Sequence, residues 1–259
     1  MPLPHIVSDA AYSKYESQLK KEVMAYPVPN HIGIIMDGNR RYAQEVLNAS
    51  AEEGHLMGRD KLDEVIHWCL DIGVRHLTVY AFSTENFNRD PDEVEYIMEM
   101  IAKSLHEFAD SEEVHRLHVG VKLIGDREML SDVVLEAVDY AEEKTKGYTD
   151  LVVYMAIAYG GRQELTNATR QIASKVKSGE LDVDDITEEL ISSYMWTRDT
   201  PDPDLILRTS GEVRISNFLL WQMAYSELYF TDVYWPGFRF IDLLRAVRTY
   251  QQRKRRYGV

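Results

Sequence analysis

Short apolar runs alternate with longer segments of mixed polarity along most of the chain. The short runs are typical of buried strands, whereas the longer segments repeat apolar residues at helical spacing. Alternating strands and helices favour βαβ crossovers. We therefore predict a single α/β domain with a mainly parallel central sheet flanked by helices. Strands are expected at residues 31–36, 74–82, 118–125, 151–160 and 204–209.

The first 29 residues differ from the rest of the chain. They are polar, only partly helical in pattern, and end at Pro27 and Pro29. The sequence thus predicts a polar N-terminal extension over residues 1–29 and one α/β domain over residues 30–259. Helices of that domain are expected at about 39–48, at about 55–70, through 94–105 and from about 241.

The composition limits the possible partners and the compartment. A net charge of −14 repels a phosphate backbone and argues against nucleic-acid binding. The single cysteine, Cys69, excludes an intramolecular disulfide and suits a reducing cytosol. The apolar runs are too short to cross a bilayer, and the N-terminus lacks the pattern of a signal peptide. We expect a cytoplasmic protein, whose basic run at 253–256 could touch an anionic membrane surface.

Three polar clusters follow predicted strands directly. They read DGNRRY after the first strand, FSTENFNR after the second, and RTSGEVRIS after the strand at 204–209. Because parallel strands end at the same edge of a sheet, all three clusters should lie together where α/β folds bind ligands. Their shared location is more informative than any one of the motifs.

The first cluster combines a carboxylate with two guanidinium groups. Gly38 allows a tight turn, and Arg40 and Arg41 at a helix start could hold a diphosphate. Asp37 would be a poor neighbour for phosphate unless a cation lies between them, and Mg²⁺ suits such oxygen ligands. The alternative is that Asp37 or Asn39 caps the helix while the arginines face solvent.

The other two clusters offer further polar groups. Arg208, Arg214 and Ser216 could hold a second diphosphate; alternatively, the arginines pair with Glu212 at the surface. The sequence leaves Glu227 either as an exposed acid between packed faces or as a further metal ligand. Between the two diphosphate sites lie hydrogen-bonding groups that could instead form an ordinary helix-capping loop: Ser83, Thr84, Glu85, Asn86 and Arg89.

The sequence resembles the cis-prenyltransferases, the undecaprenyl diphosphate synthase family. The matching blocks stand in the family's order and cover most of residues 30–240: HIGIIMDGNRRYA, GHLMG, LTVYAFSTENFNR, IAYGGRQEL and LILRTSGEVRISNFLLWQMAYSELYFTDVYWPGF. The resemblance implies a homodimeric α/β fold with an apolar substrate tunnel. It also implies Mg²⁺-dependent condensation of isopentenyl diphosphate with an allylic prenyl diphosphate. The product would be a polyprenyl diphosphate, a precursor of lipid carriers that peripheral contact with a membrane could help to release.

The resemblance also implies roles for single residues. Asp37 matches the catalytic, metal-associated aspartate, and Glu227 matches a metal ligand. Asn86 matches a residue proposed to help in proton removal. Arg208, Arg214 and Ser216 match the isopentenyl diphosphate site. The other positions that match substrate-binding segments are Gly38, Asn39, Arg40, Arg41, Tyr42, His55, Ser83, Thr84, Glu85, Phe87, Arg89 and Ile215.

Some positions depart from the family pattern. Tyr42 and Phe87 stand where tryptophan is usual, and Val213 replaces a histidine of many bacterial members. Residues 42–53 lack the usual glycine and arginine and carry acids instead. These departures leave open a transfer of the prenyl group to another nucleophile, such as an alcohol. A non-catalytic subunit of a heteromeric synthase is a further alternative, although such subunits typically lose the aspartate that is present here as Asp37.

Overall fold

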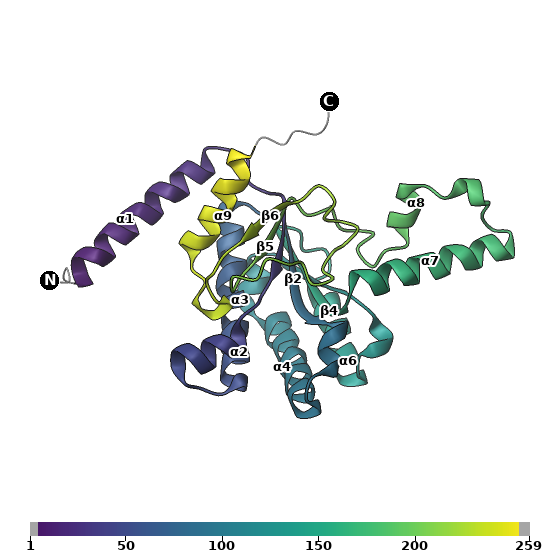
Figure 1. The fold of residues 1–259 in the computed structure, drawn as a ribbon, viewed down its shortest axis with the longest axis horizontal. Coiled ribbons are helices and arrows are strands. Elements are labelled where there is room, and N and C mark those ends of the chain that lie inside the picture. Colours follow the sequence, from purple (N-terminus) through teal and green to yellow (C-terminus); the bar gives the residue numbers. More distant parts are fainter. Residues whose placement is uncertain (1–4, 254–259) are drawn as a thin grey trace.

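The structure is a computed structural model that describes residues 5–253 (Figure 1). Its centre is a six-stranded sheet with the order β3-β4-β2-β1-β5-β6. Every neighbouring pair of strands is parallel, which confirms the predicted α/β class. The strands are β1 (His31–Ile35), β2 (His76–Ser83), β3 (Val119–Ile124), β4 (Leu151–Tyr159), β5 (Leu205–Arg208) and β6 (Glu227–Phe230).

Helices connect the successive strands from β1 to β5 and cover the sheet. Apolar side chains of β1, β2 and β5 pack with α3 and α9 in one continuous core, and those of α4 and α6 form a second cluster. No helix within residues 5–253 is long and apolar enough to cross a bilayer. The helices are α1 (His5–Met24), α2 (Asn39–Arg41), α3 (Ala51–Ile72), α4 (Pro91–Asp110), α5 (Glu112–Arg116), α6 (Asp132–Lys144), α7 (Gly161–Ser178), α8 (Glu188–Ser193) and α9 (Phe240–Gln252).

Helix α3 begins four residues before the predicted start. Ser50 and Glu53 form a capping box, in which each side chain bonds to the backbone N–H of the other residue. The helix ends at Gly73, whose φ of 85° suits glycine. The acids of the unusual 42–53 segment therefore have a local function, because Glu53 completes the cap and Glu52 lies in the positively polarised first turn.

The segment after β1 is not the regular helix that the sequence predicted at 39–48. It consists of the short helix α2 followed by a π-helical turn, Tyr42–Leu47. Asn48 ends the turn with a φ of 54°. The wider turn separates α2 from the start of α3, so the chain doubles back and α2 packs against α3.

Strand β6 was not predicted. Its four residues follow an apolar stretch without strand periodicity, and they pair with β5 at the edge of the sheet. The strand thus depends on a partner that is distant in sequence. This pairing later decides where Glu227 lies.

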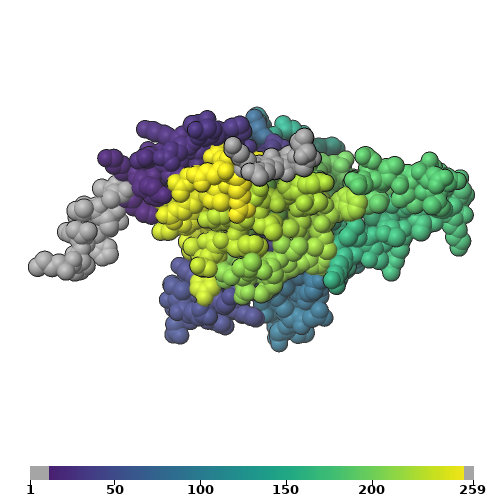
Figure 2. Space-filling model, turned by 45° about the horizontal axis from the view of Figure 1, so that its top comes forward, coloured from purple at the N-terminus to yellow at the C-terminus, as the bar shows by residue number. Residues whose placement is uncertain are grey.

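Two helical segments extend from the sheet. Helix α1, within the predicted extension, lies beside α9, and its Leu19 and Val23 are fully buried in the main core. Helices α7 and α8 stand away from the body on the opposite side (Figures 1 and 2). Of the basic run at 253–256, only Arg253 lies within the described residues.

Candidate active site

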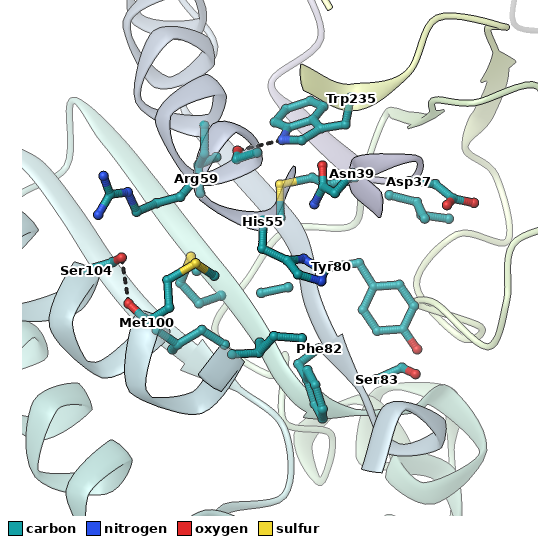
Figure 3. A pocket seen from close by; sticks show the side chains of 18 of the residues that line it. Asp37, Asn39, His55, Arg59, Tyr80, Phe82, Ser83, Met100, Ser104 and Trp235 are labelled. Atoms are coloured by element: carbon teal, nitrogen blue, oxygen red, sulfur yellow. Dashed lines mark hydrogen bonds between the residues drawn. The ribbon is translucent and has the colours of Figure 1, made fainter. Parts of the chain in front are cut away.

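The three polar clusters meet at the carboxyl edge of the sheet. Strand β1 lies between β2 and β5, with Ile35 paired to Tyr80 on one side and to Arg208 on the other. The loops after these strands therefore leave the sheet next to one another, and a cavity of about 410 Å³ lies between them (Figure 3). Nine predicted site residues line this cavity: Asp37, Asn39, His55, Ser83, Asn86, Arg89, Arg208, Arg214 and Ser216.

Asp37 lies between two guanidinium groups. Its Oδ2 accepts a hydrogen bond of 2.7 Å from Arg208 Nη2, and its Oδ1 accepts one of 3.1 Å from Arg41 Nη2. Burial works to raise the pKa of Asp37, but the hydrogen bonds and charges of Arg208 and Arg41 outweigh it and hold this pKa below its usual range. Asp37 is therefore a carboxylate at neutral pH.

Arg208 is the buried cation of the site, with only 4% of its surface exposed. Its Nη1 donates to Ser216 Oγ at 2.7 Å and to the carbonyl oxygen of Arg214 at 2.5 Å. Its Nε is buried and has no hydrogen-bond partner within the protein. Because a buried donor without a partner is costly, this atom suits an anionic ligand that completes its bonding.

Glu212 connects the first and third clusters. Its Oε1 accepts from Arg41 Nη1 at 3.2 Å, and its Oε2 accepts from Arg214 Nη1 at 2.5 Å. Ser210 Oγ accepts a further bond of 2.7 Å from Arg41. The alternative of arginine pairing with Glu212 is thus realised for Arg214. Arg208 is different, because it turns inward to Asp37 instead.

Gly38 makes the turn that presents Asp37 to the cavity. Its φ is 101°, and a Cβ atom here would lie 2.6 Å from the Tyr234 ring and 3.0 Å from Ser210 Cβ. Gly38 also occupies the N-cap position of α2, where no side chain caps the helix. The alternative that Asp37 or Asn39 serves as the cap is therefore wrong.

Asn39 points into a niche on α3. A Cβ atom on Gly58 would lie within 2.7 Å of three atoms of the Asn39 side chain, and one on Gly54 would lie 2.4 Å from the Asn39 carbonyl oxygen. Both glycines of the GHLMG block thus allow α2 to approach α3 closely. Asn39 Oδ1 is buried without a hydrogen-bond partner in the protein and lines the cavity, so a ligand donor could reach it.

The second cluster forms a short 3-10 turn, Thr84–Asn88, at the end of β2. Asn86 Oδ1 accepts from the Ser83 backbone N–H at 3.0 Å. Glu85 turns away to accept from Asn217 Nδ2 at 2.9 Å, and Thr84 donates to Glu85 at 3.2 Å. The loop is thus a capping structure, as the alternative expected, yet it also places Ser83 and Asn86 at the cavity wall.

The sequence interpretation missed Glu93 as part of the site. Its carboxylate accepts from Arg89 Nη1 at 2.9 Å and lies 3.3 Å from His55 Nε2 and 3.6 Å from Arg40 Nη1. Burial works to raise the pKa of Glu93, but Arg89, His55 and Arg40 together lower it. The available signal was its i+4 spacing from Arg89, which is also common at helix surfaces.

The two aromatic positions that depart from the family pattern lie outside the cavity lining. Phe87 meets buried Phe82 edge to face at 4.9 Å between ring centroids, and Tyr42 meets Tyr234 in the same way at 6.4 Å. Phe87 therefore packs behind Phe82, which lines the cavity, whereas neither Tyr42 nor its partner Tyr234 lines it. Ile215 is half-buried and also lies outside the lining.

Glu227 does not join Asp37 within this chain. Glu227 begins β6 and pairs with Leu205 of β5, which in turn pairs with Ile32 of β1. It therefore lies level with Ile32, five residues before Asp37. At 3.3 Å per residue this separates the two backbone positions by roughly 16 Å along the strand direction. Glu227 Oε2 instead accepts from Arg253 Nη1 at 2.6 Å. Within one chain the two acids are therefore apart, because one acid starts a parallel strand and the other follows one. The role of Glu227 as a metal ligand stays a prediction.

The far part of the cavity is apolar. From the polar edge at Asp37 it runs between α3 and α4 over the middle of the sheet (Figure 3). Its walls here are aliphatic, aromatic and methionine side chains, among them Leu62, Ile97, Met100, Ile101, Leu105, Phe108, Val121 and Met155. A ligand with an anionic head and a long hydrocarbon tail matches this division. The fold and the site together define a prenyltransferase.

Comparisons with known proteins agree. The family model described as "Putative undecaprenyl diphosphate synthase" matches residues 35–258. A Methanopyrus kandleri protein named tritrans,polycis-undecaprenyl-diphosphate synthase (geranylgeranyl-diphosphate specific) is 51% identical over 247 residues, covering 95% of this chain and 91% of its own. A Methanocaldococcus jannaschii protein with the same name is 51% identical and covers 94% of this chain and 88% of its own.

Two solved structures share the fold. Lavandulyl diphosphate synthase from Lavandula x intermedia, in complex with dimethylallyl diphosphate, has a TM-score of 0.82 at 35% identity and covers 90% of this chain and 98% of its own. A "probable undecaprenyl diphosphate synthase" from Campylobacter jejuni has a TM-score of 0.72 at 31% identity, with coverages of 90% and 100%. The chain belongs to the undecaprenyl diphosphate synthase family. It is an enzyme that condenses isopentenyl diphosphate with an allylic prenyl diphosphate to give a polyprenyl diphosphate.

Proposed function

We propose that this prenyltransferase uses geranylgeranyl diphosphate as its allylic primer and extends it to a long-chain polyprenyl diphosphate. The names of the two archaeal relatives support this primer. The observation that carries the assignment of the site is the buried Arg208, which holds ionised Asp37 and keeps a free Nε donor above an apolar cavity. Glu53 completes the cap of α3 and Glu52 lies in its first turn, so these acids give no reason to propose another acceptor.

In this proposal the polar edge binds two diphosphates. Arg40 and Arg41, with the backbone around Gly38 and with His55, hold the diphosphate of the allylic chain. Arg208, Arg214 and Ser216 hold isopentenyl diphosphate. The guanidinium groups stabilise the negative charge that develops as the allylic carbon–oxygen bond breaks. That bond cleavage releases diphosphate. The isopentenyl double bond forms the new carbon–carbon bond to the allylic carbon, and one proton is then lost.

Asn86 is proposed to act where that proton leaves. It lines the cavity at the end of β2, next to the first cluster and on the side away from the third, because β1 lies between β2 and β5. Its Oδ1 already accepts a backbone hydrogen bond from Ser83, which fixes the orientation of the amide. Ser83 and Arg89 contact the substrates beside it, whereas Thr84, Glu85 and Phe87 belong to the same turn but lie outside the lining.

Mg²⁺ is the proposed cofactor. Within residues 5–253, no three His, Cys, Asp or Glu side chains are placed together to hold a metal ion. Asp37 is nevertheless an ionised carboxylate at the cavity, and Mg²⁺ commonly binds through one or two carboxylates together with substrate phosphates and water. The ion would neutralise diphosphate charge there. Glu227 could contribute only from another chain, because it lies at the opposite edge of the sheet.

A primer panel tests the proposed function. Purified protein is incubated with labelled isopentenyl diphosphate and, in parallel, with dimethylallyl, geranyl, farnesyl or geranylgeranyl diphosphate, with Mg²⁺ or with EDTA. We expect the largest kcat/KM with geranylgeranyl diphosphate and no turnover with EDTA. Mass spectrometry then gives the product length. A preference for a shorter primer would refute the assigned substrate. If no primer were elongated, the assignment of this cavity as the active site would be refuted.

A homodimer is also proposed. Helices α7 and α8 stand away from the body, and a groove of about 1380 Å³ separates α7 from β3 and α6. Strand β3 is an edge strand whose outer side pairs with no described strand. Such a projecting arm and open groove suit a second copy of the chain. Light scattering with size-exclusion chromatography should give twice the 30.0 kDa of one chain, and a mass of one chain would refute the dimer.

Three broader assignments complete the proposal. The domain boundary near residue 30 is supported by the family match, which starts at residue 35, after α1. The cytoplasm remains the proposed compartment, since the chain has one cysteine. Because the product is a long hydrocarbon, we also propose peripheral contact with an anionic membrane during release. Co-sedimentation with anionic vesicles, compared with neutral ones, tests that contact.

A further inference from the structure

A second cavity lies beside the substrate cavity. It has a volume of about 240 Å³ and is lined by α3, α4, α5 and the start of β3. A few side chains form a wall common to both cavities, and they come from α3 and α4: Arg59, Asp63, Ile66, Ser104 and Phe108. The two spaces are therefore separated by side chains alone, which can move without a change in the backbone.

The two cavities form one line across the sheet. The main cavity extends from Asp37 to Val121 and Val153, which are level with Ile32 of β1. The second cavity reaches Val119, two residues nearer the amino edge of the sheet. At 3.3 Å per residue, the distance from Asp37 to Val119 measured along the strand direction is about 23 Å. A growing hydrocarbon that starts at the diphosphate site is thus directed at the second cavity.

An ion pair stands at the common wall. Arg59 Nη1 of α3 lies 3.4 Å from Glu107 Oε2 of α4, and the same guanidinium donates to Asp60 at 2.7 and 2.9 Å. Figure 3 shows Arg59 at the end of the cavity that lies away from Asp37, on the side of Ser104. The Glu107 side chain is half exposed, so the pair contributes little free energy and can open readily, while Asp60 retains the guanidinium.

The rest of the wall suits passage of a hydrocarbon. The Ser104 hydroxyl donates to the Met100 carbonyl oxygen at 2.7 Å, so its hydrogen is satisfied within α4. Serine is also small, which leaves space opposite Arg59. Burial is the main cause that raises the pKa of Asp63, so the wall disfavours the charged form of this carboxyl. The methylene groups of Arg59 can line the passage when its charged end faces solvent.

We propose that the Arg59–Glu107 ion pair is an openable partition of the prenyl-chain tunnel, and that Arg59 and Ser104 determine product length. With the pair closed, the far end of the hydrocarbon stops at the common wall. With the pair open, the chain continues into the second cavity and elongation proceeds further. The proposal rests on the chain elongation described above and adds the residues that limit it.

Product lengths of variants test the partition. Each protein is incubated with geranylgeranyl diphosphate and excess isopentenyl diphosphate, and the products are measured by mass spectrometry. Arg59→Ala and Glu107→Gln remove the pair and should lengthen the main product by at least one isoprene unit. Ser104→Phe fills the passage and should shorten it. Lys103→Gln is the matched control, because Lys103 also pairs with Glu107, at 3.7 Å, but lines neither cavity.

The outcomes separate the partition from the proposed function. An unchanged length distribution in Arg59→Ala and Glu107→Gln, with elongation intact, overturns the partition. A shift in Lys103→Gln equal to that in Glu107→Gln also overturns it, because surface charge would then be the cause. Failure of the wild-type protein to elongate geranylgeranyl diphosphate counts against the proposed substrate instead. Thermal melting checks the folding of each variant. If Ser104→Phe does not fold, the product length of Arg59→Ala is the deciding measurement.

Discussion

Asp37 and Arg208 lie 171 positions apart in the chain and form an ion pair of 2.7 Å. They meet because β1 and β5 are neighbours in the sheet, with Ile35 paired to Arg208. Arg208 is almost fully buried, whereas Asp37 is partly exposed to the cavity. The pair thus gives the carboxylate a fixed position and keeps it ionised, which is what a site for diphosphate and a divalent cation requires.

Removing the charge of Asp37 should separate catalysis from folding. Asp37→Asn keeps an acceptor for Arg208 and should fold near the wild-type melting temperature, with kcat lowered by ~100-fold or more. Asp37→Ala also leaves a buried guanidinium with one bond fewer and should lose roughly 1–3 kcal/mol of stability. Steady-state kinetics and urea unfolding measure the two effects. Near-normal turnover of Asp37→Asn would show that the carboxylate is not needed.

Arg208→Lys keeps the positive charge but loses the planar fork. One ammonium cannot reproduce the simultaneous contacts of Arg208 with Asp37, Ser216 and the Arg214 carbonyl. We expect KM for isopentenyl diphosphate to rise by ~10-fold or more, with a smaller change for the allylic primer. Arg162→Lys, which lies outside the cavity lining, is the control. If Arg208→Lys had the same KM as wild type for each of the two substrates, the assigned diphosphate site would be contradicted.

Gly38→Ala should be more harmful than its backbone angle alone explains. The left-handed conformation costs an L-residue ~1–2 kcal/mol, and the new methyl group would also meet the Tyr234 ring at 2.6 Å. Gly179→Ala is the matched control, because its φ is 78° and nothing lies within 4 Å of the new Cβ. Unfolding in urea should show the larger loss for Gly38→Ala, and only that variant should lose activity. Equal losses of stability in the two variants would mean that the loop around Gly38 shifts to make room for the methyl group.

Stability should depend on pH through Glu164. This carboxyl anchors α7 by accepting from Tyr159 at 2.6 Å and Gln222 at 2.9 Å, and burial is the main cause that raises its pKa above 4.5. A raised folded-state pKa contributes stability that is complete below the unfolded-state pKa, near 4.5, and is lost as pH rises through the folded-state value. The stability difference between wild type and Glu164→Gln should therefore shift in favour of wild type as pH falls towards 4.5. Urea midpoints at a series of pH values measure this difference, and a constant difference would refute the raised pKa.

Local patterns predicted much of the fold because they depend on neighbours in sequence. The apolar runs identified β1 to β5, and helical spacing identified α3 and α4. The edge strand β6 was missed because its pairing with β5 is not encoded in its own residues. The start of α3 was misplaced because the capping box of Ser50 and Glu53 was overlooked. The π-helical turn at 42–47 has no simple sequence signal.

The sequence by itself determined which groups are available at the carboxyl edge, because parallel strands place the residues that follow them at one side of the sheet. It could not determine which groups face one another there. Only the tertiary structure paired Asp37 with Arg208, collected Arg89, Arg40 and His55 around Glu93, and separated Glu227 from the site. Those outcomes depend on strand order and on helix packing between distant segments. A linear pattern records neither, since side-chain contacts across the fold arise only after the sheet is assembled.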